Sequence, residues 1–359
     1  MRLGLVGLGW AANAFHFPAL KQVPGAIVVG GCDISGERRT AWEVQTGTPA
    51  FETFNELVER GAPDVVVVAT PPDSHADFCV EALERGLHVL CEKPFVTDLR
   101  QADRVLLAAA AAGRQIAVNH EFREKPIFKV LKQRIDSEEF GRLVFCQIWQ
   151  LMDLAPWNEP VAWRAAMPNR TLLEGGVHLV DLMLELFGEH PTAVYARHSS
   201  GLQREHSADA IHILMMEFSG GRLGQITINR LCPAATRYAE VRADCEHASL
   251  RASEGGRALI RVGMKRAERS GFRLELGAGG LAWVERGTSR KVLARAPRSV
   301  GMAATAALWR ELLPAFEQNV EPPSSGREAR AGLAVIEAAY RSAQTGARIE
   351  LEPPGVAHP

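Results

Sequence analysis

The peptide DVVVVAT at residues 64–70 places four valines side by side, with no polar residue between them. A strand with one solvated face alternates apolar and polar residues, so a continuous apolar run indicates a strand that is covered on both faces. Similar short runs lie at residues 2–7, 26–33, 87–92 and 115–120, and segments with helical character separate them. This alternation predicts a doubly wound α/β domain, in which a parallel sheet lies between two layers of helices.

The pattern changes after residue 120, where longer strands and hairpin signals begin. Two strand-like runs surround Gly220 and Gly221, which is typical of a β-hairpin. The expected elements of this part are helices near 125–135, 172–187, 302–318 and 327–345, a strand at 143–153 and the hairpin at 210–231. We therefore predict two domains, residues 1–120 and 121–359, and expect the second to be α+β with a large antiparallel sheet.

The composition limits the partners of the chain. Its 359 residues carry a formal net charge of −1, so no excess of charge draws it to nucleic acid or to an anionic membrane. The sequence has neither a recognisable signal peptide nor an apolar run long enough to span a bilayer. Its six cysteines lack CxxC spacing, which favours neither a zinc site nor a dense disulfide framework. We expect a cytoplasmic protein with small-molecule partners.

The peptide GLVGLGWAA follows the first predicted strand and opens a helix. Gly7, Gly9 and Ala12 form a GxGxxA pattern, which supplies a tight turn, a close approach for a pyrophosphate and a small residue for helix packing. A glycine-rich turn alone is a weak signal, but here it lies between a strand and a helix N-terminus, the context that phosphate binding needs. We assign Trp10 and Ala11, in the same turn, to this predicted dinucleotide site.

Asp33 ends the second predicted strand, at the position where an acid can accept hydrogen bonds from a ribose 2′-hydroxyl. Its charge would repel the 2′-phosphate of NADP, so NAD is favoured as the cofactor. Arg38 and Arg39 follow closely and could contact such a phosphate if the loop folds back, or could lie exposed on the next helix. NADP therefore stays open as the alternative cofactor.

Two further loops leave the carboxyl ends of predicted parallel strands, which is the edge where doubly wound sheets bind ligands. Lys93 follows a strand that ends abruptly, and Pro94 prevents that strand from continuing. A lone lysine at a strand end is often only a solvated terminus, but at this edge it belongs beside the cofactor and becomes a candidate catalyst. The other residues assigned to the cofactor crevice are Thr70, Pro71, Pro72, His75 and Glu92.

A second polar cluster lies on one face of the helix expected at 172–187. Such a face can simply be solvated, but Gly175 and Gly176 are costly inside a helix and indicate that another group approaches closely. A carboxylate and a histidine one turn apart can also ligate zinc; no third ligand is evident, so we predict no metal site. The cluster, spaced by four, three and four residues, consists of Glu174, His178, Asp181 and Glu185.

Taken in order, these motifs resemble the glucose-fructose oxidoreductase and inositol dehydrogenase (Gfo/Idh/MocA) family. The resemblance covers nearly the whole chain, and the joint order of the motifs is more specific than any one of them. It implies a Rossmann domain followed by a domain whose open, mostly antiparallel sheet forms a homodimer or homotetramer interface. The matching peptides are GLVGLGWAANAFHFPAL, ATPPDSHADFCVEALERGLHVLCEKPF, VNHEFR, WRAAMPNRTLLEGGVHLVDLMLELFG and GLAVIEAAYRSAQTGARIEL.

The resemblance also implies roles for single residues. In the family, the lysine matched by Lys93 and the histidine matched by His178 face the nicotinamide, and the acid matched by Asp181 touches substrate hydroxyls. Glu174 stands where many members have an aspartate, and Pro168 to Arg170 replace a usual glycine triplet. These two departures leave the substrate and the proton relay open.

The resemblance extends to the domain junction and to the bond after the candidate lysine. Asn119, His120 and Arg123 match a family stretch that either lines the cleft, where we assign Asn119 to the cofactor and the other two to the substrate, or fixes the hinge. The peptide bond between Lys93 and Pro94 is expected to be cis.

The substrate pocket is the least predictable part of the chain. We assign Trp163 and Arg164 to it, with aromatic core packing as the alternative for Trp163. Neither residue identifies a particular substrate.

Together these residues predict reversible oxidation of a secondary alcohol, on a sugar, cyclitol or related polyol, by hydride transfer to NAD. His178 suits the base that takes the hydroxyl proton, with Glu174 or Asp181 orienting it. Lys93 would stabilise the developing alkoxide when protonated, or would act as the base itself if desolvation removes its proton.

Two other functions stay open. The chain could be a regulatory protein that binds a dinucleotide without catalysis, although the presence of both Lys93 and His178 argues against this. It could also be a glycosidase or lyase that uses NAD to oxidise a sugar transiently before a substituent is eliminated. Net accumulation of NADH distinguishes a dehydrogenase from both.

Overall fold

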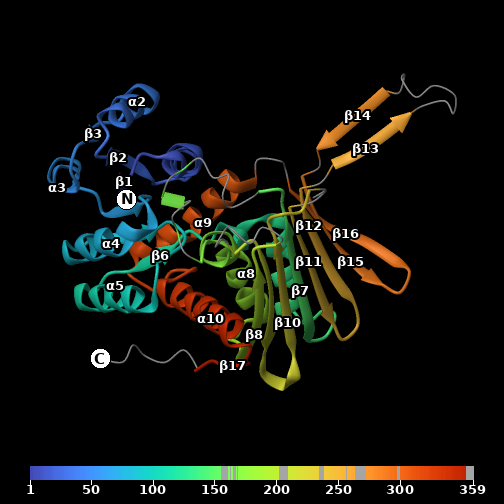
Figure 1. Cartoon of the computed structure of the whole chain (residues 1–359). Helices are drawn as coiled ribbons and strands as arrows, with labels where there is room; N and C mark the ends of the chain where they lie inside the picture. Colours follow the sequence, from blue (N-terminus) through green and yellow to red (C-terminus); the bar gives the residue numbers. More distant parts are fainter. Residues whose placement is uncertain are drawn as a thin grey trace.

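The described part of the computed structural model contains two large sheets, with helices packed between and around them, and a separate pair of strands (Figure 1). Pro168, the first residue of one departure from the family pattern, lies outside the described residues. The structure describes residues 1–154, 161, 163–164, 167, 169–201, 209–233, 238–255, 257–262, 272–277, 279–296 and 300–352.

The first sheet has six strands, all parallel, in the order β3-β2-β1-β4-β5-β6. The four valines of β4 are completely buried, as their unbroken apolar run predicts. Sequence analysis did not identify β3, because a strand of two residues carries no periodicity. The predicted doubly wound α/β domain is confirmed. Its strands are β1 (Arg2–Val6), β2 (Ile27–Cys32), β3 (Ala50–Phe51), β4 (Val65–Val68), β5 (His88–Cys91) and β6 (Ile116–Val118).

Helices cover both faces of this sheet (Figure 1). Three of them begin at a side chain that accepts a hydrogen bond from the backbone of the first turn, namely Ser35, Thr53 and Asp98. No helix in the described part of the chain has the length and apolar character needed to cross a membrane. The helices are α1 (Phe17–Leu20, after a π-helical turn at Ala12–His16), α2 (Gly36–Thr46), α3 (Phe54–Glu56, continued by a π-helical turn at Leu57–Gly61), α4 (His75–Glu84) and α5 (Leu99–Ala112).

The second sheet has nine strands in the order β16-β15-β12-β11-β7-β10-β9-β8-β17. Only β7 and β10 pair in parallel within it, so the expected large, mostly antiparallel sheet is confirmed. The predicted hairpin joins β9 to β10, and its turn uses Gly220 and Gly221 at φ of 67° and 75°. The strands are β7 (Leu143–Leu151), β8 (Ala193–Ser199), β9 (Ile211–Glu217), β10 (Leu223–Asn229), β11 (Ala239–Cys245), β12 (Ser249–Glu254), β15 (Gly280–Arg286), β16 (Ser289–Ala296) and β17 (Ile349–Glu350).

Two further strands and several helical segments belong to the described part, besides short 3₁₀ turns at Pro72–Ser74 and Ser219–Gly221. The strands β13 (Arg257–Val262) and β14 (Phe272–Gly277) form a separate pair that extends away from the nine-stranded sheet (Figure 1). The helical segments are the 3₁₀ turn at Glu121–Glu124, α6 (Pro126–Asp136), α8 (Val177–Phe187, after a π-helical turn at Thr171–Gly176), α9 (Val300–Glu317) and α10 (Gly326–Thr345).

One face of the nine-stranded sheet packs on α8 and α10 (Figure 1). Leu182 and Met183 of α8 share a buried cluster with Ile148 and Ile226 of the sheet and Val335 of α10. Burial of apolar area of this kind contributes about 25 cal/mol per Å². The packing fixes α8, which carries two of the candidate catalytic residues.

The opposite face of the same sheet leaves apolar side chains in solvent. Ile213 and Met215 of β9 are 46% and 49% exposed, and Leu223 of β10 is 44% exposed. The strand pairing places all three on the same side, because Leu223 aligns with Glu217, two residues beyond Met215.

The two closing helices return to the first sheet. Trp309 and Leu312 of α9 lie in the same buried cluster as Leu3 and Leu5 of β1. In α10, Leu333 joins the cluster on the other side of that sheet. The end of the chain therefore completes the core around the six-stranded sheet, and the division at residue 120 stays a prediction.

Candidate functional site

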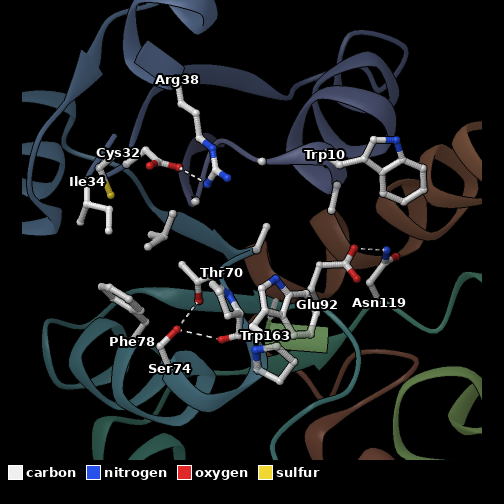
Figure 2. Close-up of a pocket in the computed structure, with 18 of the residues that line it drawn as sticks. Trp10, Cys32, Ile34, Arg38, Thr70, Ser74, Phe78, Glu92, Asn119 and Trp163 are labelled. Carbon is white, nitrogen blue, oxygen red and sulfur yellow. Dashed lines mark hydrogen bonds and ion pairs between the residues drawn. The ribbon is translucent and has the colours of Figure 1, made fainter. Parts of the chain in front are cut away.

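A cavity of about 710 Å³ lies at the carboxyl ends of the parallel strands and extends to the second unit. This edge is where ligands bind in open α/β sheets. Of the predicted cofactor residues, Ala12 and His75 are not among its lining. The ones that line it are Gly7, Gly9, Trp10, Ala11, Asp33, Arg38, Thr70, Pro71, Pro72, Glu92, Lys93 and Asn119, and Figure 2 labels several of them.

The glycine turn has the geometry that its sequence pattern predicts. Gly7 has φ of +89°, and a Cβ there would lie 2.7 Å from the carbonyl oxygen of Ala69, so a larger residue does not fit. A Cβ on Gly9 would meet nothing within 4 Å, which leaves open space for a ligand on that side. Ala12 is completely buried and packs the following helix. The loop and helix N-terminus can therefore receive a pyrophosphate.

Asp33 lies in the cavity wall beside this turn. Its carboxylate accepts hydrogen bonds from the backbone N–H groups of Leu8 (2.9 Å) and Ser35 (2.8 Å). The guanidinium of Arg38 lies 3.5 Å from the same carboxylate, and both residues line the cavity (Figure 2 labels Arg38). Arg39 instead donates to the carbonyl oxygens of its own loop. Arg38 is thus the arginine that is placed to meet a ribose or its substituent.

His75 connects two loops beneath the cavity. Its Nδ1 lies 2.9 Å from the carbonyl oxygen of Pro94, and its Nε2 lies 2.8 Å from that of Thr70. Both ring nitrogens therefore contact backbone. The side chain positions the loops that follow β4 and β5, and its assignment as a direct cofactor contact stays a prediction.

Glu92 is a buried carboxylate, and both of its oxygens accept hydrogen bonds. Its Oε1 accepts hydrogen bonds from Asn119 Nδ2 (2.7 Å) and contacts Nε2 of His16 at the same distance, while Oε2 accepts from the N–H of Lys93 (3.0 Å). Burial acts to raise the pKa of Glu92, but His16, the charge of Lys93 and the Asn119 bond lower it to about 2. Glu92 is therefore ionised and fixes the backbone from which Lys93 projects.

Lys93 joins the two units of the molecule. The Lys93–Pro94 peptide bond is cis, as expected from the family resemblance. Its Nζ donates to the carbonyl oxygen of Glu174 (3.3 Å) and lies 3.7 Å from the Glu174 carboxylate. The structure thus brings together two candidate catalytic residues that 81 positions separate, and their catalytic roles stay a prediction.

Glu174 lies among cations. Besides Lys93, its carboxylate has Arg164 Nε at 3.5 Å and Arg170 Nε at 4.0 Å. Burial acts to raise its pKa, but Lys93, Arg164 and Arg230 lower it overall. Glu174 therefore carries a negative charge and anchors the cavity wall.

Trp163 and Arg164 both line the cavity, and their assignment to substrate binding stays a prediction. The Arg164 guanidinium lies 5.1 Å from the centre of the Trp163 ring, and the two side chains support each other. The arrangement places an aromatic surface and a cation next to Glu174 (Figure 2 labels Trp163).

His178 is buried beside the cavity rather than in its lining. Its imidazole stacks on Phe122, with ring centres 4.4 Å apart and an angle of 10° between the planes. Burial, Lys93 and His120 hold the pKa of His178 well below its usual value, so the ring is neutral at neutral pH. Neutral imidazole is the form that a general base requires.

Asp181 is bound by Arg123. The guanidinium donates Nη2 to Oδ1 (2.6 Å) and Nε to Oδ2 (2.8 Å), a bidentate pair. Arg123 also contacts Glu328 of α10 at 3.0 Å, and His120 lies 3.9 Å from Asp181. None of Asp181, Arg123 and His120 is among the residues that line the cavity, so their geometry is that of a buried junction. Their assignment to substrate binding stays a prediction.

Sequence analysis missed Glu121, which lines the cavity between Lys93 and His178. Its Oε2 lies 3.7 Å from Nδ1 of His178. Burial raises the pKa of Glu121 to about 7, although Lys125 and Lys93 act in the opposite direction. The sequence contained a signal for Glu121, because this residue follows the carboxyl end of β6. Lys93 was predicted from the same kind of position, after the carboxyl end of a parallel strand.

Comparison with known proteins agrees with this geometry. Residues 1–120 match the family model described as "Oxidoreductase family, NAD-binding Rossmann fold", and residues 128–269 match the "GFO/IDH/MocA C-terminal domain". The chain belongs to the Gfo/Idh/MocA family. The family resemblance read from the sequence is confirmed.

Two curated relatives and one solved structure illustrate the similarity. The chain is 28% identical to 1,5-anhydro-D-fructose reductase of Ensifer adhaerens, over 58% of this chain and 64% of the relative. It is 32% identical to inositol 2-dehydrogenase 4 of Saccharopolyspora erythraea, over 55% of this chain and 57% of the relative. The match thus spans less than two thirds of either relative. An oxidoreductase from Agrobacterium radiobacter in complex with NAD⁺, L-tartaric acid and magnesium has a TM-score of 0.80 at 18% identity, with 98% of each chain covered.

Proposed function

We propose that the chain oxidises, reversibly, a secondary alcohol of a sugar, cyclitol or related polyol by hydride transfer to NAD. One observation carries the proposal: a single cavity extends from the glycine turn and Asp33 to Lys93 and Glu174. A dinucleotide on the turn would place its reactive end near the lysine. The names of the relatives, a sugar reductase and an inositol dehydrogenase, support the substrate class.

The residues divide the proton and charge chemistry between them. NAD, when bound, accepts the hydride from the carbinol carbon. Lys93 projects at the cavity wall from a backbone fixed by Glu92, and its ammonium would donate a hydrogen bond to the substrate oxygen and stabilise the developing negative charge. Neutral His178 is suited to take the hydroxyl proton. Lys93 is thus proposed as the electrostatic stabiliser and His178 as the base.

NAD is proposed as the preferred cofactor because Asp33 presents a carboxylate where the ribose hydroxyls would lie. Replacing Asp33 by serine removes this charge and leaves Arg38 free to meet a 2′-phosphate. The ratio of kcat/KM for NAD to that for NADP is expected to fall at least about tenfold, because a hydrogen bond to a charged group contributes about 1.5–3 kcal/mol. Glu37→Gln is the control: it removes a carboxylate from the first turn of α2, the helix that carries Arg38, and should leave the ratio unchanged. A higher preference for NADP in the unchanged protein would contradict the proposal.

The proposed activity is tested with a panel of sugars, cyclitols and polyols and with NAD, by following the absorbance of NADH. Steady accumulation of NADH with at least one compound is expected. Release of a product without net NADH would favour the glycosidase or lyase. Tight NAD binding without any reaction would favour a regulatory protein.

We propose that the exposed face of the nine-stranded sheet joins copies of this chain into a homodimer or homotetramer. Its apolar side chains, Ile213, Met215 and Leu223, lie on neighbouring strands and are about half exposed in the single chain. The double variant Ile213→Glu and Met215→Glu is expected to reduce the mass measured by light scattering to that of a monomer. Val44→Glu, on an exposed position of α2, is the control and should keep the oligomer. A monomeric unchanged protein would contradict the proposal.

A cytoplasmic location is proposed from the cysteines. All six are free thiols, and four of them are buried. Protein of this kind needs no oxidising compartment to fold. Fractionation of the cells that produce the chain tests the location, and recovery in a secreted fraction would contradict it.

A further inference from the structure

Glu121 lies in the peptide VNHEFR, between His120 and Arg123, and the family resemblance gave it no role of its own. Its side chain is 15% exposed and lies in the cavity wall, whereas the neighbouring His178 is only 7% exposed and is not among the lining residues. A proton that reaches the buried imidazole therefore needs a route back to the cavity. Glu121 both lines the cavity and lies 3.7 Å from Nδ1 of His178.

Contacts between His178 and acids select Glu121 as its partner. Nδ1 of His178 is buried without a hydrogen-bond partner, and Glu121 Oε2 lies 3.7 Å from it. The carboxylates of Glu174 and Asp181 are instead bound by cations, and neither forms an ion pair with His178 within the described part of the chain. This distance is longer than a hydrogen bond, and catalytic hydrogen bonds often tighten only in the complex with substrate.

The imidazole is held in place for this contact. Phe122, the residue after Glu121, stacks on one face of the ring, and the ammonium of Lys125 lies 3.3 Å from the centre of Phe122. Lys125 is itself held by Glu254 of β12 at 2.7 Å. The short turn at Glu121–Glu124 therefore supplies both the surface on which His178 rests and the carboxylate beside its Nδ1.

The geometry points to Glu121 as the positioning residue that accepts the proton of His178 Nδ1–H and exchanges it with the cavity, an inference that rests on the proposed function. In the oxidation direction, the C–H bond of the carbinol breaks and its electron pair moves with the hydrogen to NAD⁺. Nε2 of His178 takes the hydroxyl proton, and the Nδ1 proton passes to Glu121, which releases it to water in the cavity. Alcohol and NAD⁺ thus become ketone, NADH and one proton.

The charged surroundings make this exchange depend on pH. Below about 7 Glu121 is protonated and cannot accept a proton, so the oxidation rate should rise as the pH increases through that value. In the reverse direction the rate should fall as the pH increases, because protonated Glu121 is then the donor. The pKa of His178 itself lies well below its usual value, so titration of His178 cannot account for a change in rate (a limb of the pH profile) near pH 7. The titratable and charged groups that act on Glu121 from the packed elements are Glu92, Lys93, Lys125, His178 and Tyr238, and Lys125 is paired with Glu254.

The experiment compares pH profiles of kcat and kcat/KM for the unchanged protein and for Glu121→Gln. The amide keeps the volume but can neither gain nor lose a proton, so kcat for oxidation should fall about 100-fold or more and the limb near 7 should disappear. Glu121→Asp should retain the limb with an intermediate rate. Glu124→Gln, which removes a carboxylate from the same turn where it pairs with Lys129, is the control and should keep both the rate and the limb. A Glu121→Gln profile within twofold of the unchanged one, with its limb intact, would overturn the inference.

A second readout does not depend on a substrate. In protein labelled with ¹⁵N-histidine and loaded with NAD, the ring nitrogens of His178 should shift with a midpoint near pH 7 as Glu121 titrates, and Glu121→Gln should abolish this transition. A comparison with His178→Gln assigns the signals. If no alcohol is oxidised, the proposed function fails while this titration still decides whether Glu121 and His178 exchange a proton. An identical transition in Glu121→Gln would overturn the pairing.

Discussion

Replacing Lys93 by methionine is expected to lower kcat for alcohol oxidation by about 100- to 1,000-fold, the usual effect of removing one preorganised group that stabilises developing charge. Methionine keeps an unbranched stem of similar length, so the packing of the cavity wall should change little. What is lost is the ammonium beside Glu174, 3.3 Å from its carbonyl oxygen and 3.7 Å from its carboxylate. Affinity for NAD, measured by fluorescence titration, should change far less, because the glycine turn and Asp33 are intact.

Lys132→Met is a matched control for this variant. Lys132 is exposed to a similar degree, 23% against 22%, and also pairs with an acid, but it lies on α6 outside the cavity lining. Its replacement should leave kcat unchanged. Full turnover by Lys93→Met on an identified substrate would contradict the role assigned to the lysine.

Replacing His178 by alanine is expected to reduce kcat by about 100- to 10,000-fold, the range for loss of a general base. The imidazole is neutral at neutral pH because burial, Lys93 and His120 lower its pKa, so it is ready to accept a proton. Alanine also removes a stack on Phe122. His178→Gln, which retains more volume, therefore accompanies it, and thermal unfolding of both variants separates loss of stability from loss of catalysis.

A histidine outside the cavity serves as the control. His190 lies just beyond the end of α8, is partly buried and does not line the cavity. His190→Ala should retain the rate. If His178→Gln folds, binds NAD and keeps full turnover, His178 is not the base.

Several parts of the fold could be predicted because local sequence determines them. The valines of β4 are unbroken in sequence and buried on both sides in the structure. Gly7 is required by a positive φ and by the carbonyl of Ala69, and Gly220 and Gly221 turn the hairpin between β9 and β10. In each case the constraint acts within a few residues, where sequence patterns are informative.

The parts that could not be predicted depend on contacts between distant segments. His16 meets Glu92 across 76 positions, and no feature of the first helix indicates this pair. The spacing of the polar residues predicted one helical face, but Glu174 lies in the π-helical turn before α8, and the spacing could not reveal that Arg123 binds Asp181. For the same reason, the sequence did not indicate that Glu121 lies beside His178.

The central claim is transfer of a hydride from a carbinol carbon to NAD. It is tested most directly with an active alcohol from the panel that carries deuterium on that carbon, followed by mass spectrometry of the nicotinamide product. The account predicts that reduced NAD accumulates with one deuterium per molecule, in equal amount to the ketone, and that Lys93→Met slows this transfer. Formation of product with no net deuterated NADH, or reduced NAD without deuterium, would contradict it.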